Sequence, residues 1–177
     1  MNWMNELGGI LQQYTGAGAG AAPAPEDIHD HFDQTAQAAP PETLADGLSA
    51  AFRSDETPEF GQMVASLFGQ SNGQQRAGIL NTLISAVGPS VAARLFAGKG
   101  LSGLAGLLGG GQTQITAEQA EQVSPEVAQE IAAHAEKHDP SIIDTVSNFY
   151  AEHPTLIKSL GSAALAITLA KIASSYR

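Results

Sequence analysis

Apolar residues recur at helical spacing along most of the chain. After Pro58 they fall three and four residues apart, and similar stripes lie within 73–87, 124–138 and 139–150. This spacing gathers apolar side chains on one side of a helix, and proline or glycine punctuates the segments. The alternation typical of strands does not extend over any useful length. We therefore predict an all-α protein, a compact bundle of about eight to ten short helices.

The N-terminal segment, residues 1–14, predicts a short amphipathic helix. Its apolar stripe is formed by Trp3, Leu7, Ile10 and Tyr14 and widened by Met4 and Leu11. Residues 15–25 read TGAGAGAAPAP, a composition typical of a flexible linker. A helix on such a tether needs a surface for its apolar face. That surface belongs to its own helical domain (predicted over 26–177), to a neighbouring copy or to a membrane.

The C-terminal segment predicts an unusually apolar helix over 155–176. Twelve uncharged residues separate Lys158 from Lys171. They would span roughly 18 Å, short of the ~30 Å of a bilayer core. A helix that is apolar on most sides requires burial on most sides. It is therefore either the central helix of the domain or a surface that packs against other copies or lipid.

The segment 98–111, GKGLSGLAGLLGGG, has glycine at every third position from Gly100 to Gly106. Three structures are compatible with it: a helix whose glycines admit another backbone, an apolar loop, or an extended polyproline-like stretch. We favour the closely packed helix. Beyond it, Thr116 and Gln119 predict a capping box, and Ser124-Pro125 predicts another helix start.

Charge is distributed in blocks. The net charge of −10 is composed of −9 over 1–59, +3 over 60–117, −7 over 118–152 and +3 over 153–177. An acidic chain repels phosphate, so nucleic acid is excluded as an expected partner. Blocks of opposite sign can pair within one molecule or between copies.

The chain offers little chemistry for catalysis. It has no cysteine, no G-x-S-x-G and no P-loop sequence. His134 and His138 share a helical face with Glu130, but Ala135 stands where the zinc protease pattern requires glutamate. We therefore assign no catalytic, cofactor-binding or metal-binding residue and expect no enzyme and no cofactor. The N-terminus lacks the features of a signal peptide, which predicts a cytoplasmic location, possibly peripheral to a membrane.

The sequences LSGLAGLLGGG (101–111) and ITAEQAEQVSPE (115–126) resemble parts of YidB-like bacterial proteins. The resemblance covers about 95–135. It implies a bacterial origin and a non-enzymatic helical protein, and it carries over no functional residue.

These features together predict a structural, self-assembling protein. Its homo-oligomers or polymers would form through the terminal helices and the complementary charge blocks. Peripheral attachment to a membrane or granule surface, or service as a helical adaptor, are the alternatives. The polar face of the first helix has no lysine or arginine to attract anionic lipid. The predicted assembly residues are Trp3, Met4, Leu7, Ile10, Leu11, Tyr14, Leu160, Ile167, Leu169 and Ile172.

Overall fold

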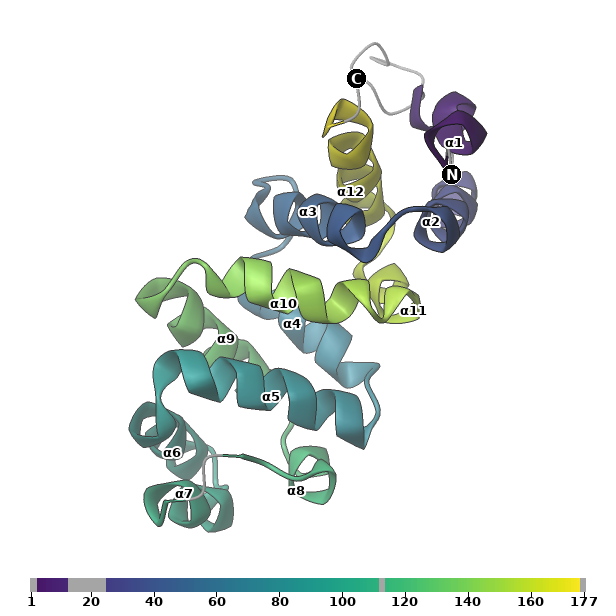
Figure 1. The fold of residues 1–177 in the computed structure, drawn as a ribbon. Coiled ribbons are helices and arrows are strands. Elements are labelled where there is room, and N and C mark those ends of the chain that lie inside the picture. The colour runs from purple at the N-terminus through teal and green to yellow at the C-terminus, as the bar shows by residue number, and fades with distance from the viewer. Residues whose placement is uncertain (1–2, 13–24, 112–113, 176–177) are drawn as a thin grey trace. The chain divides into compact units, whose positions relative to one another are not determined.

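Helices make up all of the regular structure in the residues that the computed structural model describes, namely 3–12, 25–111 and 114–175. Within these residues, twelve α-helices and one 3-10 helix follow one another, with no strand (Figure 1). The all-α prediction is confirmed. The helices outnumber the predicted eight to ten, because the Gly/Leu-rich segment forms a helix of its own and the C-terminal segment is broken.

The helices gather into two compact units. Unit 1 is built from both ends of the chain, Met1–Pro58 and Ser147–Arg177, and unit 2 is the continuous stretch Glu59–Val146. The predicted linker, residues 15–25, lies outside the described residues except for Pro25. The predicted boundaries 1–14, 15–25 and 26–177 stay predictions.

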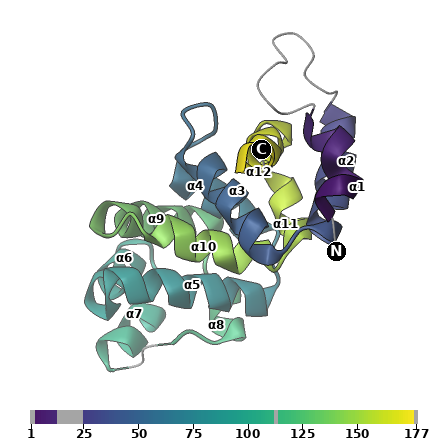
Figure 2. The same cartoon turned by 45° about the horizontal axis from the view of Figure 1, so that its top comes forward.

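Unit 1 is organised around its last helix, α12, which contacts α3, α2 and α1. Figure 2 shows α1 alongside α2. The side chains of Phe32, Leu48, Phe52 and Leu165 are buried in this unit. Each such side chain contributes roughly 1.5–3 kcal/mol on leaving water. The elements of unit 1 are α1 (Trp3–Gln12), α2 (Pro25–Ala38), α3 (Pro41–Arg53), the end of α10 (Ile142–Ala151), α11 (Pro154–Ile157), η1 (Lys158–Leu160) and α12 (Ser162–Ser175).

Glycine sets the distance between α3 and α12. A Cβ on Gly47 would lie 2.7 Å from the carbonyl oxygen of Thr168 and 2.8 Å from its Cγ2. The fully buried Thr168 satisfies its hydroxyl by donating to the carbonyl of Ala164 at 2.9 Å. A polar residue is therefore accommodated inside an apolar helix without an unmet hydrogen bond.

Unit 2 is organised around α5, α9 and α4. Helix α4 lies along α9, α5 contacts α8 and α9, and α6 contacts α7. A Cβ on Gly61 of α4 would lie 2.9 Å from the carbonyl oxygen of Gln129, so this pair also approaches closely. The elements of unit 2 are α4 (Phe60–Gly69), α5 (Gly73–Val87), α6 (Pro89–Gly98), α7 (Ser102–Gly109), α8 (Ala117–Glu121), α9 (Pro125–His138) and the start of α10.

Helix ends in unit 2 use local hydrogen bonds. The predicted box at Thr116 and Gln119 is confirmed, with reciprocal bonds of 3.0 and 3.2 Å. Ser124 holds the N-cap position before Pro125, although its side chain makes no capping hydrogen bond there. Arg76 serves the end of α4: its Nε donates to the carbonyls of Phe68 and Ser71, so this cation completes a helix terminus.

Asn81 joins two segments that are distant in sequence. Its Oδ1 accepts from the backbone N–H of Ile115 at 2.6 Å, and its Nδ2 donates to the carbonyl of the same residue at 3.1 Å. Because Asn81→Ala removes the partners of both the N–H and the carbonyl of Ile115, we expect it to lower the free energy of unfolding by about 2 kcal/mol. Urea denaturation measures this, with Gln74→Ala at an exposed position of α5 as the control. Equal stability of the two variants would contradict the prediction.

Candidate functional site

The N-terminal helix docks on its own unit. Helix α1 contacts α12 and α2, and Leu7 is only 3% exposed. Ile10 is half-buried. Trp3, Met4 and Leu11 belong to the same helix, and their side chains, like all of Tyr14, lie outside what the structure describes. The terminal helices, which the sequence could not place relative to each other, therefore meet within unit 1.

The prediction of one unbroken helix over 155–176 is wrong. α11 ends at Ile157, η1 occupies the next three residues, and Gly161 then has a φ of +94° before α12 begins. A residue with positive φ interrupts the helical hydrogen-bond pattern, and glycine adopts that conformation without steric cost. The apolar stretch is thus divided into α11, η1 and α12, and Gly161 separates η1 from α12.

The predicted assembly residues of this region divide by burial. Leu169 and Ile172 of α12 are buried in unit 1, whereas Leu160 and Ile167 are half-buried. The all-round apolar character of α12 follows from its neighbours, because α1, α2 and α3 all pack against it. The central-helix alternative therefore describes its position in unit 1. Two copies can therefore contact each other through these buried residues only if α1, α2 or α3 of one copy is replaced by the same helix of the other copy.

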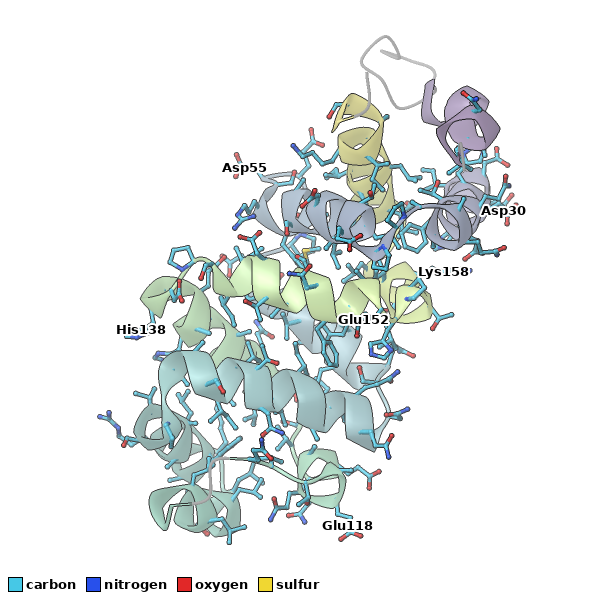
Figure 3. The ribbon with its side chains drawn as sticks, viewed as in Figure 1. Asp30, Asp55, Glu118, His138, Glu152 and Lys158 are labelled. Carbon is cyan, nitrogen blue, oxygen red and sulfur yellow. The ribbon has the colours of Figure 1, made fainter. Side chains whose placement is uncertain are left out.

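Two ion pairs join charge blocks of opposite sign. In unit 1, Nζ of Lys158 lies 2.8 Å from Oδ2 of Asp33. In unit 2, Nζ of Lys99 lies 2.7 Å from Oε1 of Glu130. Figure 3 labels Lys158, which projects from the end of α11. All four side chains are partly exposed, so each pair contributes at most about 1 kcal/mol. The blocks thus pair, in these two cases, within one molecule.

The glycine-rich segment is helical, but its glycines admit no neighbour. A Cβ on Gly100, Gly103 or Gly106, the regularly spaced glycines, would meet nothing within 4 Å. Leu104 and Leu108 are buried, and Leu107 is 42% exposed. The helix favoured from the sequence is therefore present as α7. The expected close approach at these three glycines is wrong, because α7 turns Leu104 and Leu108 toward the rest of unit 2 and its glycines outward. Among the described residues, a Cβ would come within 3 Å of the backbone of another helix at Gly47 and Gly61, which the sequence patterns do not mark.

The histidine pair of α9 stands on an exposed face. His134 and His138 are both exposed, and Figure 3 shows His138 at the end of α9. Glu130, the third member of that face, is engaged by Lys99. Among the residues that the structure places, no three or more His, Cys, Asp or Glu side chains are close enough to hold a metal ion.

No single helix in the described ranges is both long and apolar enough to cross a membrane. Within these ranges, α5 and α6 are the one pair of helices that together reach the required length and hydropathy, and they are bent by 115° relative to each other. Leu80, Leu83 and Phe96 of these helices are fully buried in unit 2, and Leu95 is half-buried. The apolarity of this pair is thus accounted for by the interior of the unit.

Comparison with known proteins adds no relative. No family model, no curated protein and no solved structure matches this chain. The resemblance to YidB-like proteins and its implied bacterial origin therefore stay predictions, and the candidate site is the contact of α1 with α12 and α2.

Proposed function

We propose that the protein is a non-enzymatic assembly protein whose copies join by exchanging α1. The observation that supports this most directly is the docking of α1, with Leu7 buried, on α12 and α2 of the same unit. A surface that accepts α1 of its own chain accepts α1 of a second copy with the same contacts. Two copies then exchange helices reciprocally, and several copies exchange them in series.

The sequence between α1 and α2 sets the balance between the closed and exchanged forms. Twelve residues, 13–24, lie between the ends of these helices, and Gly, Ala and Pro dominate them. A short tether gives the attached helix an effective concentration on the order of millimolar at its own site. Exchange between copies therefore competes with docking on the same chain when the local concentration of copies is also near millimolar, as in a crowded assembly. Exposed charges of opposite blocks would then steer the copies together.

Concentration-dependent mass tests this proposal. Sedimentation equilibrium from about 10 μM to 1 mM should show growth from 18.2 kDa toward the dimer or larger species. Leu7→Asp should remain monomeric throughout, because it places a charge at the buried contact of α1. Asn5→Asp is the matched control, since Asn5 is exposed on the same helix and the charge change is identical. Dimerisation that persists unchanged in Leu7→Asp would refute exchange through α1.

The membrane and adaptor alternatives lead to different results in the same variants. Flotation with neutral and anionic vesicles measures lipid binding, and a membrane role requires α1 to leave α12 and insert its apolar face. We expect no flotation with either composition. Flotation of the wild type that is lost in Leu7→Asp would replace assembly by membrane attachment as the function of α1.

A further inference from the structure

Unit 2 has an open pocket with polar walls that the contact of α1 does not use. It has a volume of about 390 Å³ and lies between α5 and the turn that joins α9 to α10. One apolar residue from each side, Ala86 and Ile142, contributes to it, and Ile142 is buried. The lining residues are Thr82, Ser85, Ala86, Asp139, Ser141, Ile142 and Thr145.

The hydroxyl groups of the lining direct their protons toward the protein. Thr82 and Ser85 donate to the carbonyls of Gly78 and Asn81, both at 2.9 Å, and Ser141 donates to Oδ1 of Asp139 at 2.7 Å. A hydroxyl whose proton is engaged presents only its lone pairs to a ligand. These walls therefore offer hydrogen-bond acceptors.

Asp139 adds the charge of the pocket. Its Oδ1 also accepts from the backbone N–H of Ser141 at 3.1 Å, which fixes the carboxylate at the turn. The side-chain hydrogen bond from Ser141 lowers the pKa of Asp139, so the group is anionic at neutral pH. The opposing dipoles of α9, which ends here, and α10, which begins here, offset each other. Eight acidic and four basic residues give unit 2 a net charge of −4, which favours a cation despite the adjacent His138.

We propose that this pocket binds an alkylammonium group. An ammonium donates three N–H bonds and accepts none, which complements a wall of oxygen acceptors with one carboxylate. The methylene stem of such a ligand would lie against Ala86 and Ile142. A divalent metal fits less well, because a single carboxylate supplies the charge of this pocket. The cation is either a free aliphatic polyamine or the lysine side chain of another protein.

NMR titration of the full chain tests the proposal with putrescine and with N-acetyl-lysine methylamide as probes, and with KCl at matched ionic strength as the reference. We expect saturable shifts of the backbone signals of Thr82, Ser85 and Ser141. Asp139→Asn should weaken the affinity about tenfold or more, because a charge-assisted bond is lost. The ligand that binds more tightly identifies the source of the cation, and either order supports the proposal.

Asp144→Asn is the matched control, because it removes the same charge from an exposed position of α10 that does not line the pocket. It should retain the affinity of the wild type. If both substitutions weakened the affinity for the probe equally, the effect would be one of general electrostatics and the proposal would be overturned. The absence of saturable shifts at millimolar ligand would also overturn it. The test is independent of α1 exchange, because Leu7→Asp should bind either probe as the wild type does.

Discussion

Gly47→Ala is expected to destabilise the protein although alanine is the better helix former. The substitution gains about 1 kcal/mol of helix propensity in α3. The new methyl group, however, would lie within 3 Å of the backbone oxygen and Cγ2 of Thr168. Because a backbone atom cannot swing aside like a flexible side chain, α3 and α12 must separate, and overpacking of this kind typically costs 1–3 kcal/mol. We expect a net loss of up to about 2 kcal/mol of unfolding free energy.

Gly106→Ala provides the matched control for this prediction. Gly106 lies inside α7, and a Cβ there would meet nothing within 4 Å. Alanine should therefore raise stability by up to about 1 kcal/mol through helix propensity and reduced freedom of the unfolded chain. Urea denaturation followed by circular dichroism measures both variants. The structure requires the two substitutions to change the free energy of unfolding in opposite directions. A stabilising Gly47→Ala would therefore contradict the close contact between α3 and α12.

Shortening the segment between α1 and α2 is expected to convert the monomer into an exchanged dimer. Deletion of residues 16–22, GAGAGAA, leaves five residues between Gln12 and Pro25. The greatest distance that the connection can span falls from ~43 Å to ~20 Å. The shortened connection is then strained or too short for α1 to dock on its own chain. Docking of α1 on a second copy keeps all of its contacts. We expect the dimerisation constant to strengthen by at least about 100-fold, from millimolar toward micromolar.

Light scattering behind a sizing column at about 50 μM distinguishes the two forms. Replacement of residues 16–22 by seven Gly/Ser residues is the control, because it changes the sequence and keeps the length. That variant should remain monomeric at this concentration. A monomeric deletion variant, with Leu7 still protected from solvent in hydrogen exchange, would show that five residues suffice for closure and would remove the main support for exchange.

Local sequence signals predicted the helices well. The predicted start at Ser124-Pro125 coincides with the first residue of α9, and the Thr116–Gln119 box forms as its spacing indicates. These signals act within one helical turn, through fixed φ angles and unpaired backbone N–H groups. They require no information about distant residues. The break at Gly161 was missed because a glycine inside an apolar run is compatible with either a helix or a turn.

The positions of close helix contacts at glycine could not be predicted from the sequence. The regular glycines of 98–111 were expected to mark a close helix contact, yet the contacts lie at the isolated Gly47 and Gly61. Periodicity tells which residues share a helical face, and only the partner helix determines which face it meets. Asn81 is a second example, because its hydrogen bonds to Ile115 span 34 residues and no local pattern predicts them.

Local sequence patterns were enough to predict the all-α class, several helix starts, the amphipathic first helix and the separation of charge into blocks. Which of these features meet depends on how the helices pack. The tertiary structure joined the two chain ends in unit 1, buried Leu7 and α12 there, paired Lys158 with Asp33, and formed the pocket at Asp139 from α5 and the start of α10. The reason is physical: helix formation depends on bonds between neighbours in sequence, whereas burial, ion pairing and pocket formation depend on which apolar faces exclude water together.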